Sequence, residues 1–192
     1  HREWFDKVIA MTGDKTLDNW KNKKDYFTGV DKAMKILMPN ASETERTLQA
    51  RKWYQEAVVK YIKEHPESLN KKVVDLLKRL KSKFILALLT SNTKEYIQQI
   101  LEASGIQGIY DIVFASSVEE VPIKAELFKK FIETYGQPKF YIAGRGKEAF
   151  EECVKLNIIS IYFPSEEINP EIEKLASRTA RTEEELEKLI EN

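Results

Sequence analysis

The chain has 192 residues, which is enough for one sizeable core or for a core with a small appendage, but too few for two full α/β domains. Lys+Arg and Asp+Glu both total 31, so no net field attracts nucleic acid, an anionic membrane or a polycationic partner. Apolar residues make up 42% and charged residues 32% of the chain, which excludes disordered and fibrous classes. The many Lys and Glu residues are also typical of thermophilic proteins.

Cysteine and histidine usage limits the possible compartments and metals. Cys153 is the only cysteine, and His1 and His65 are the only histidines, so neither an intrachain disulfide nor the usual zinc site can be assembled. No apolar run approaches the roughly 20 residues of a membrane-spanning helix, and no signal peptide is recognisable. We therefore expect a reducing, cytoplasmic location without a membrane partner, and Cys153 is expected to pack inside its helix.

The N-terminal part is predicted to contain one short strand followed by helices. Val8 to Met11 is the first apolar run, and it ends in Thr12-Gly13-Asp14. From about Asp18 to Leu80, apolar residues recur at helical spacing, which predicts about three helices. These helices should form a compact cap in which Trp20, Trp53 and Tyr54 are mostly buried.

The breaks between these helices are marked by proline. Pro39-Asn40 separates the first helix from the second, and Pro66 to Ser68 separates the second from the third. Ser42 is expected to cap the second helix, with Glu45 as its capping-box partner.

Beyond residue 83, short apolar runs alternate with amphipathic stretches, which is typical of βα units that feed a parallel sheet. The predicted strands are 84–89, 112–115, 140–143 and 158–163. The predicted helices are 93–104, 125–135 and 147–156, with Gly105 and Gly136 closing the first two and an acidic helical tail over 171–191. The predicted fold class is α/β, with a doubly wound, mostly parallel, Rossmann-like sheet and a helical insertion near the N-terminus.

In an open α/β sheet the ligand crevice lies at the carboxyl ends of the strands. Four segments should therefore meet there, and they are Thr12-Gly13-Asp14, Thr90-Ser91-Asn92, Pro122 to Lys124, and Gly144-Arg145-Gly146.

These four segments, in this order and spacing, resemble the four motifs of the haloacid dehalogenase superfamily, which is dominated by Mg-dependent phosphatases. The resemblance spans residues 7 to 163 and implies an α/β core over 1–17 and 81–192 with a helical cap over 18–80. It places Thr12 at the nucleophile of motif one and Asp14 at the general acid/base. It also implies that Thr90 of motif two donates a hydrogen bond to a phosphoryl group.

The third and fourth motifs are also recognisable, but the fourth lacks its acids. Lys124 is the candidate for the motif-three lysine that neutralises the phosphate. In motif four, Arg145 and Ala149 stand where the family has the acids that hold Mg²⁺. Aspartyl-phosphate chemistry needs a carboxylate nucleophile and a divalent ion, and a guanidinium at a ligand position repels that ion.

The leading hypothesis is therefore a superfamily member without phosphatase turnover. It would retain an anion-binding crevice, or it would serve as a binding module for a small anion, a phosphorylated metabolite or a protein partner, with no metal and no cofactor. The anion-binding residues would be Thr12, Thr90, Ser91, Asn92, Lys124 and Arg145.

Two alternatives stay open. Asp14-Lys15-Thr16 also resembles the Asp-Lys-Thr around the phosphorylated aspartate of P-type ATPases, and in that register Asp14 is the catalytic nucleophile of an active phosphoester hydrolase that would need Mg²⁺. Alternatively, Arg145 pairs with Asp14 and closes the crevice, which leaves a purely structural interaction module.

Overall fold

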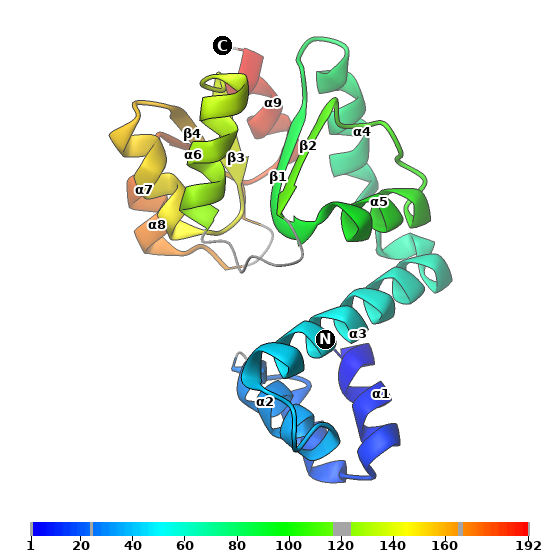
Figure 1. Ribbon diagram of the computed structural model, residues 1–192. Helices are drawn as coiled ribbons and strands as arrows, with labels where there is room; N and C mark the ends of the chain where they lie inside the picture. Colours follow the sequence, from blue (N-terminus) through cyan, green and yellow to red (C-terminus); the bar gives the residue numbers. More distant parts are fainter. Residues whose placement is uncertain (1, 24, 117–123, 165–166, 192) are drawn as a thin grey trace. The chain divides into compact units, whose positions relative to one another are not determined.

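The computed structural model describes the whole chain except residues 1, 24, 117–123, 165–166 and 192 (Figure 1). The chain divides into two compact units. The first, here the helical unit, comprises His1–Leu69 with Glu102–Gly105, and the second, here the sheet unit, comprises Asn70–Leu101 with Ile106–Asn192. None of the described helices is both long and apolar enough to cross a membrane.

The helical unit is built around one apolar cluster. Its elements are α1 (Arg2–Thr12), η1 (Lys15–Trp20), α2 (Tyr26–Leu37), α3 (Glu43–Glu64) and η2 (Pro66–Ser68). Its buried residues are Trp4, Phe5, Val8, Leu17, Ala33, Met34 and Ala50. The indole Nε1 of Trp4 donates a hydrogen bond to the carbonyl of Ala50 at 3.1 Å, which ties α1 to α3.

The predicted strand over Val8 to Met11 is wrong, because these residues lie within helix α1. Trp4, Phe5 and Val8 recur at helical spacing and are all buried, whereas Met11 is exposed, so one face of a helix satisfies the pattern. The first 17 residues therefore pack within the helical unit, in contrast to the predicted core of 1–17 and 81–192.

The predicted breaks between the helices and the predicted N-terminal capping residue of α3 are confirmed. Ser42 caps α3 in a capping box, with its hydroxyl accepting from the Glu45 backbone N–H at 3.2 Å and the Glu45 carboxylate accepting from the Ser42 N–H at 2.7 Å. Trp20 and Trp53 are half-buried against the core cluster, but Tyr54 is 36% exposed and is not part of that cluster, in contrast to the predicted burial.

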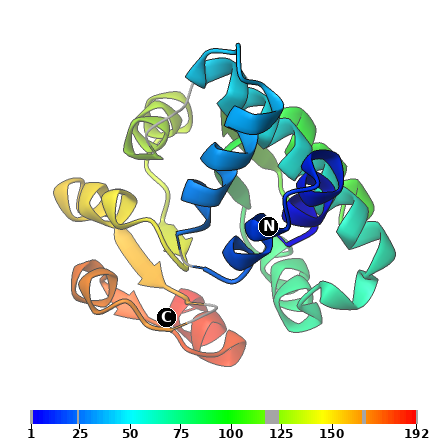
Figure 2. The same cartoon turned by 90° about the horizontal axis from the view of Figure 1, so that it is seen from below.

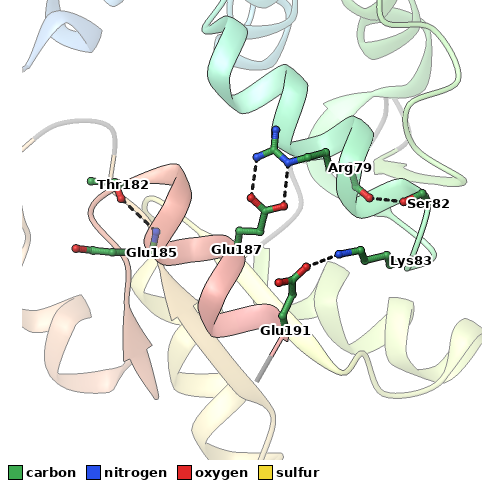
Figure 3. Close-up of polar contacts among 7 residues, drawn as sticks. All are labelled: Arg79, Ser82, Lys83, Thr182, Glu185, Glu187 and Glu191. Atoms are coloured by element: carbon green, nitrogen blue, oxygen red, sulfur yellow. Dashed lines mark hydrogen bonds and ion pairs between the residues drawn. The ribbon is translucent and has the colours of Figure 1, made fainter.

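The third predicted helix belongs to the sheet unit instead of the cap. It is α4 (Lys71–Lys81), whose buried Leu76 and Leu80 share a core with residues of α9 (Glu183–Glu191). Arg79 donates two hydrogen bonds to the carboxylate of Glu187, at 2.9 and 2.7 Å, and Lys83 pairs with Glu191 (Figure 3). The predicted cap boundary at residue 80 therefore lies beyond the division between the units at residues 69 and 70.

The sheet unit contains parallel strands with helices packed against them, as Figures 1 and 2 show, so the predicted α/β fold class is confirmed. Its strands are β1 (Ala87–Thr93), β2 (Ile112–Ser116), β3 (Phe140–Ala143), β4 (Ile159–Tyr162) and β5 (Arg178–Thr179). Its other helices are α5 (Lys94–Ala103), α6 (Lys124–Tyr135), α7 (Lys147–Lys155) and α8 (Pro170–Leu175). The described strands form two sheets, with orders β1-β2 and β3-β4-β5, and every pair is parallel.

The observed strands differ from the predicted ones mainly in β1 and in the C-terminal tail. β1 begins at Ala87 and continues through Thr93, so Thr90-Ser91-Asn92 lies inside the strand instead of after it. The C-terminal tail is interrupted by β5, because Arg178 and Thr179 pair with Ile161 and Tyr162. One apolar cluster lies between β3, β4 and the helices α6, α7 and α8. Its buried residues are Phe128, Tyr141, Ala149, Phe150, Cys153, Ile158, Tyr162 and Ile172.

Candidate functional site

The carboxyl end of β1 is irregular where the predicted phosphoryl-binding residues lie. Thr90 pairs with Ala115 and Thr93 pairs with Ser116, so the strand register shifts and Ser91 and Asn92 are two extra residues on β1. Such a bulge ends regular pairing and redirects the side chains at a strand end. The segment therefore presents a short polar loop, although it is part of the strand.

Thr90 organises this loop. Its hydroxyl oxygen accepts hydrogen bonds from the backbone N–H and the side-chain amide of Asn92, at 3.1 and 3.4 Å. Thr93 then caps α5 by accepting from the backbone N–H of Tyr96 at 3.3 Å. Thr90 donates no hydrogen bond to any described residue, so its hydroxyl proton is available to a ligand.

The carboxyl end of β3 presents Arg145 between two glycines whose positions no other residue fits well. A Cβ on Gly144 would lie 2.7 Å from the carbonyl oxygen of Phe163, which follows β4. Gly146 has a φ of 95° and precedes the first residue of α7. Arg145 is exposed and forms no ion pair or hydrogen bond with the described residues.

The side chains at this strand end do not fit Mg²⁺, which requires oxygen ligands that include carboxylates. Ala149 is 0% exposed and faces the apolar core, so it leaves no ligand where the family has an acid. Two carboxylates of α7 have cationic partners, since Glu151 lies 4.0 Å from Lys147, and Glu152 pairs with Lys155 at 2.7 Å. Among the described residues, no group of three or more His, Cys, Asp and Glu side chains could hold a metal.

Cys153 lies in the core next to this site, as expected for a packing residue. Its side chain is fully buried, and burial raises the pKa of the thiol to about 12, with a further contribution from Glu152. Burial likewise raises the pKa of Tyr141, whose buried hydroxyl has no hydrogen-bond partner among the residues that the structure describes. No sequence signal predicted this unpaired hydroxyl, because it depends on how β3 packs against α6 and α7.

Thr12 and Asp14 lie in the helical unit, where both stabilise the turn after α1. The Thr12 hydroxyl donates to the carbonyl of Val8 at 2.9 Å and accepts from the N–H of Asp14 at 3.1 Å. The Asp14 carboxylate caps η1 by accepting from the hydroxyl and the N–H of Thr16, and these bonds lower its pKa. No strand precedes either residue, so the motif-one assignment lacks the strand on which it depends.

The remaining predicted site residue, Lys124, is the first residue of α6. Its side chain and the preceding Pro122 and Ile123 lie outside the described part of the structure.

Comparisons with known proteins give a family match and several solved structures with the same fold. The model of a hydrolase family, the haloacid dehalogenase-like hydrolases, matches residues 3–154. No curated protein matches the sequence.

Solved structures share the fold at low sequence identity. A hydrolase of the haloacid dehalogenase-like family from Streptococcus pneumoniae is 15% identical, with a TM-score of 0.62, and the match covers 97% of this chain and 88% of that one. A protein from Clostridium acetobutylicum, described as a predicted phosphatase, is 19% identical with a TM-score of 0.62 over 96% and 90% of the two chains. A protein from Thermotoga maritima, provisionally described as a β-phosphoglucomutase, is 18% identical with a TM-score of 0.63 over 98% and 90%. Since the family model covers most of the sequence and the fold agrees, the chain belongs to the haloacid dehalogenase-like hydrolases.

Proposed function

We propose that this family member binds a small phosphorylated metabolite, or inorganic phosphate, at the carboxyl ends of β1 and β3 without hydrolysing it. The observation that carries the proposal is Arg145, an exposed guanidinium without a partner among the described residues, in the position where the family has an acid. In this site the positive charge comes from a side chain instead of a metal ion.

Three kinds of donor favour a phosphate at this edge. The Arg145 guanidinium can donate two parallel hydrogen bonds to two phosphate oxygens, which lysine cannot do. The Thr90 hydroxyl retains a proton to donate. Helix α7 begins directly after Gly146, and its first N–H groups and its dipole favour a nearby anion. The descriptions of two structural neighbours as a phosphatase and a phosphoglucomutase support a phosphoryl ligand.

The same residues argue against turnover. Covalent phosphoryl transfer in this family's manner needs a carboxylate nucleophile, and Thr12, which the resemblance places at that position, offers only a hydroxyl. A guanidinium stabilises the ligand's charge but does not attack phosphorus. The site is therefore suited to binding.

Calorimetric titration with inorganic phosphate tests the binding step. A charge-assisted hydrogen bond contributes about 1.5–3 kcal/mol, so Arg145→Ala should weaken phosphate binding by roughly 10- to 100-fold. Arg145→Lys should recover only part of the affinity, because it keeps the charge and loses the bidentate geometry. Lys174→Ala is the matched control, since Lys174 is also an exposed cation of the sheet unit without a described ion pair.

If phosphate does not bind, or binds equally well to Arg145→Ala, the proposal fails. Hydrolysis of p-nitrophenyl phosphate with added Mg²⁺ tests the absence of turnover, and we expect no rate above the buffer. A clear rate that chelator abolishes would contradict this expectation. Loss of that rate in Asp14→Asn would then identify Asp14 as the nucleophile.

A further inference from the structure

The ion pair between Lys147 and Glu171 lies at the same edge of the sheet unit as Arg145. Helix α7 begins with Lys147 shortly after the carboxyl end of β3, and α8 begins with Pro170 after the carboxyl end of β4. Because β3 and β4 are parallel, both ends lie at one edge of the sheet. The two helices pack against one another (Figure 1), and the Lys147 Nζ lies 2.8 Å from the Glu171 carboxylate, so the pair joins their first turns.

The start of α8, and with it Glu171, is anchored to the core. Asn169 precedes this helix, and its side-chain oxygen accepts a hydrogen bond from the backbone N–H of Glu171 at 2.9 Å. The backbone N–H of Asn169 in turn donates to the Tyr162 hydroxyl at 2.9 Å. Tyr162 is the last residue of β4 and is 1% exposed, so this chain of contacts holds Glu171 next to α7.

Arg145 precedes Lys147 by only two residues, so their Cα atoms are at most ~7 Å apart. The backbone before α7 is held against the end of β4, because the Phe163 N–H donates to the Ala143 carbonyl at 3.0 Å. A Cβ on Gly144 would lie 2.7 Å from the Phe163 carbonyl oxygen, which shows how closely the two segments approach. Two cationic residues therefore lie side by side at the ends of β3 and β4, one without an ion pair among the described residues and one paired.

The paired cation can change its partner at little cost. The side chains of Lys147 and Glu171 are 46% and 69% exposed, and an ion pair in water contributes little to stability. The other nearby carboxylate, Glu151, lies 4.0 Å away, beyond hydrogen-bond distance. A phosphate group carries about two negative charges and three acceptor oxygens, so it competes well with a single carboxylate for the Lys147 ammonium.

We propose that the anion site selects a diphosphate group, with one phosphate bound by Arg145 and the adjacent phosphate bound by Lys147, which leaves Glu171. This inference rests on the proposed function, because Arg145 must bind the first phosphate. A single phosphate satisfies Arg145 alone, whereas two linked phosphates suit two cations that are two residues apart in the chain. The exchange makes and breaks no covalent bond, and it returns the Glu171 carboxylate to water. The ligand class is therefore a metabolite that carries a diphosphate.

Calorimetric titration with inorganic pyrophosphate and with inorganic phosphate, in metal-free buffer of equal ionic strength, tests this proposal. The native protein should bind pyrophosphate about tenfold more tightly, since a charge-assisted hydrogen bond from Lys147 gains more than the loss of an exposed ion pair costs. Lys147→Ala should abolish this preference and leave phosphate affinity nearly unchanged. Lys155→Ala is the matched control and should keep the preference, because Lys155 is also an ion-paired lysine of α7, with Glu152 at 2.7 Å, but lies at its other end.

The competing carboxylate gives a second test in the opposite direction. Glu171→Gln should strengthen pyrophosphate binding by about two- to fivefold, because it removes the exposed ion pair that the ligand must replace. Glu173→Gln should have no such effect, since Glu173 lies in the same helix but pairs with Arg181, at 3.3 Å.

The outcomes separate this inference from the proposed function. Pyrophosphate binding that is no tighter than phosphate binding, or a preference that persists in Lys147→Ala, overturns the diphosphate assignment while the anion site stands. If neither anion binds, the anion site itself fails and the diphosphate assignment fails with it.

Discussion

Gly144→Ala should disturb both the junction of β3 with β4 and the anion site. The new Cβ would lie 2.7 Å from the carbonyl oxygen of Phe163, while ordinary contact begins at 3.4 Å, so the two segments must separate by about 0.7 Å. The obstacle is backbone, and it is held in place because the Phe163 N–H donates to the Ala143 carbonyl at 3.0 Å. Overpacking of this kind costs about 1–3 kcal/mol, so the urea midpoint of the sheet unit should fall accordingly.

The matched control is Gly108→Ala, where a Cβ meets nothing within 4 Å but φ is +72°. This control should cost about 1 kcal/mol from backbone strain, and it should leave phosphate affinity unchanged. Gly144→Ala should in addition weaken phosphate binding, because Arg145 moves with its neighbour. A Gly144→Ala variant with native stability and native phosphate affinity would refute the reasoning.

Three further predictions concern the N-terminal cap of α3, the buried Cys153 thiol and the ion pair between α4 and α9. Ser42→Ala should destabilise the helical unit by about 1 kcal/mol in urea unfolding, since Glu45 then loses its reciprocal partner; an unchanged midpoint would contradict this. The Cys153 thiol should not react with a disulfide reagent in the native protein at mildly alkaline pH and should react fully in urea, because burial raises its pKa to about 12; rapid native labelling would contradict it. Arg79 lowers the pKa of Glu187, so this pair stabilises the fold above the ordinary glutamate pKa and the effect is lost as pH falls through the lowered value; Glu187→Gln should flatten that acid-side decline in the urea midpoint.

Most of the sheet unit could be predicted because its local signals agree with its tertiary contacts. Strand β3 occupies the predicted residues 140–143, and Gly105 and Gly136 adopt the positive φ values, 65° and 83°, expected at helix ends. The failure over Val8 to Met11 has a physical cause. A short apolar run fits a strand or one face of a helix equally well, and only the buried Trp4 and Phe5 upstream decide for the helix.

The site was only partly predictable. The sequence order placed Arg145 and Ala149 after the correct strand, and the structure adds that the first is exposed and the second buried. The extra residues Ser91 and Asn92 could not be foreseen, because the bulge exists only relative to the register of β2. The unit to which α4 belongs was equally hidden, since its helical period is satisfied by either partner and only its contact with α9 decides.

The distribution of ion pairs explains how a chain of zero net charge can present a positive site. Lys147 pairs with Glu171 at 2.8 Å, and the Glu152 carboxylate receives both Lys155 and Lys129, at 2.7 and 3.4 Å. The charges of these lysines are thereby compensated, whereas Arg145 is exposed and forms no ion pair with the described residues. An exposed guanidinium has lost little of its hydration, so a ligand must offer more than one oxygen to replace that water at a gain. The site should therefore favour phosphate and sulfate, which present several charged oxygens, over chloride at the same ionic strength.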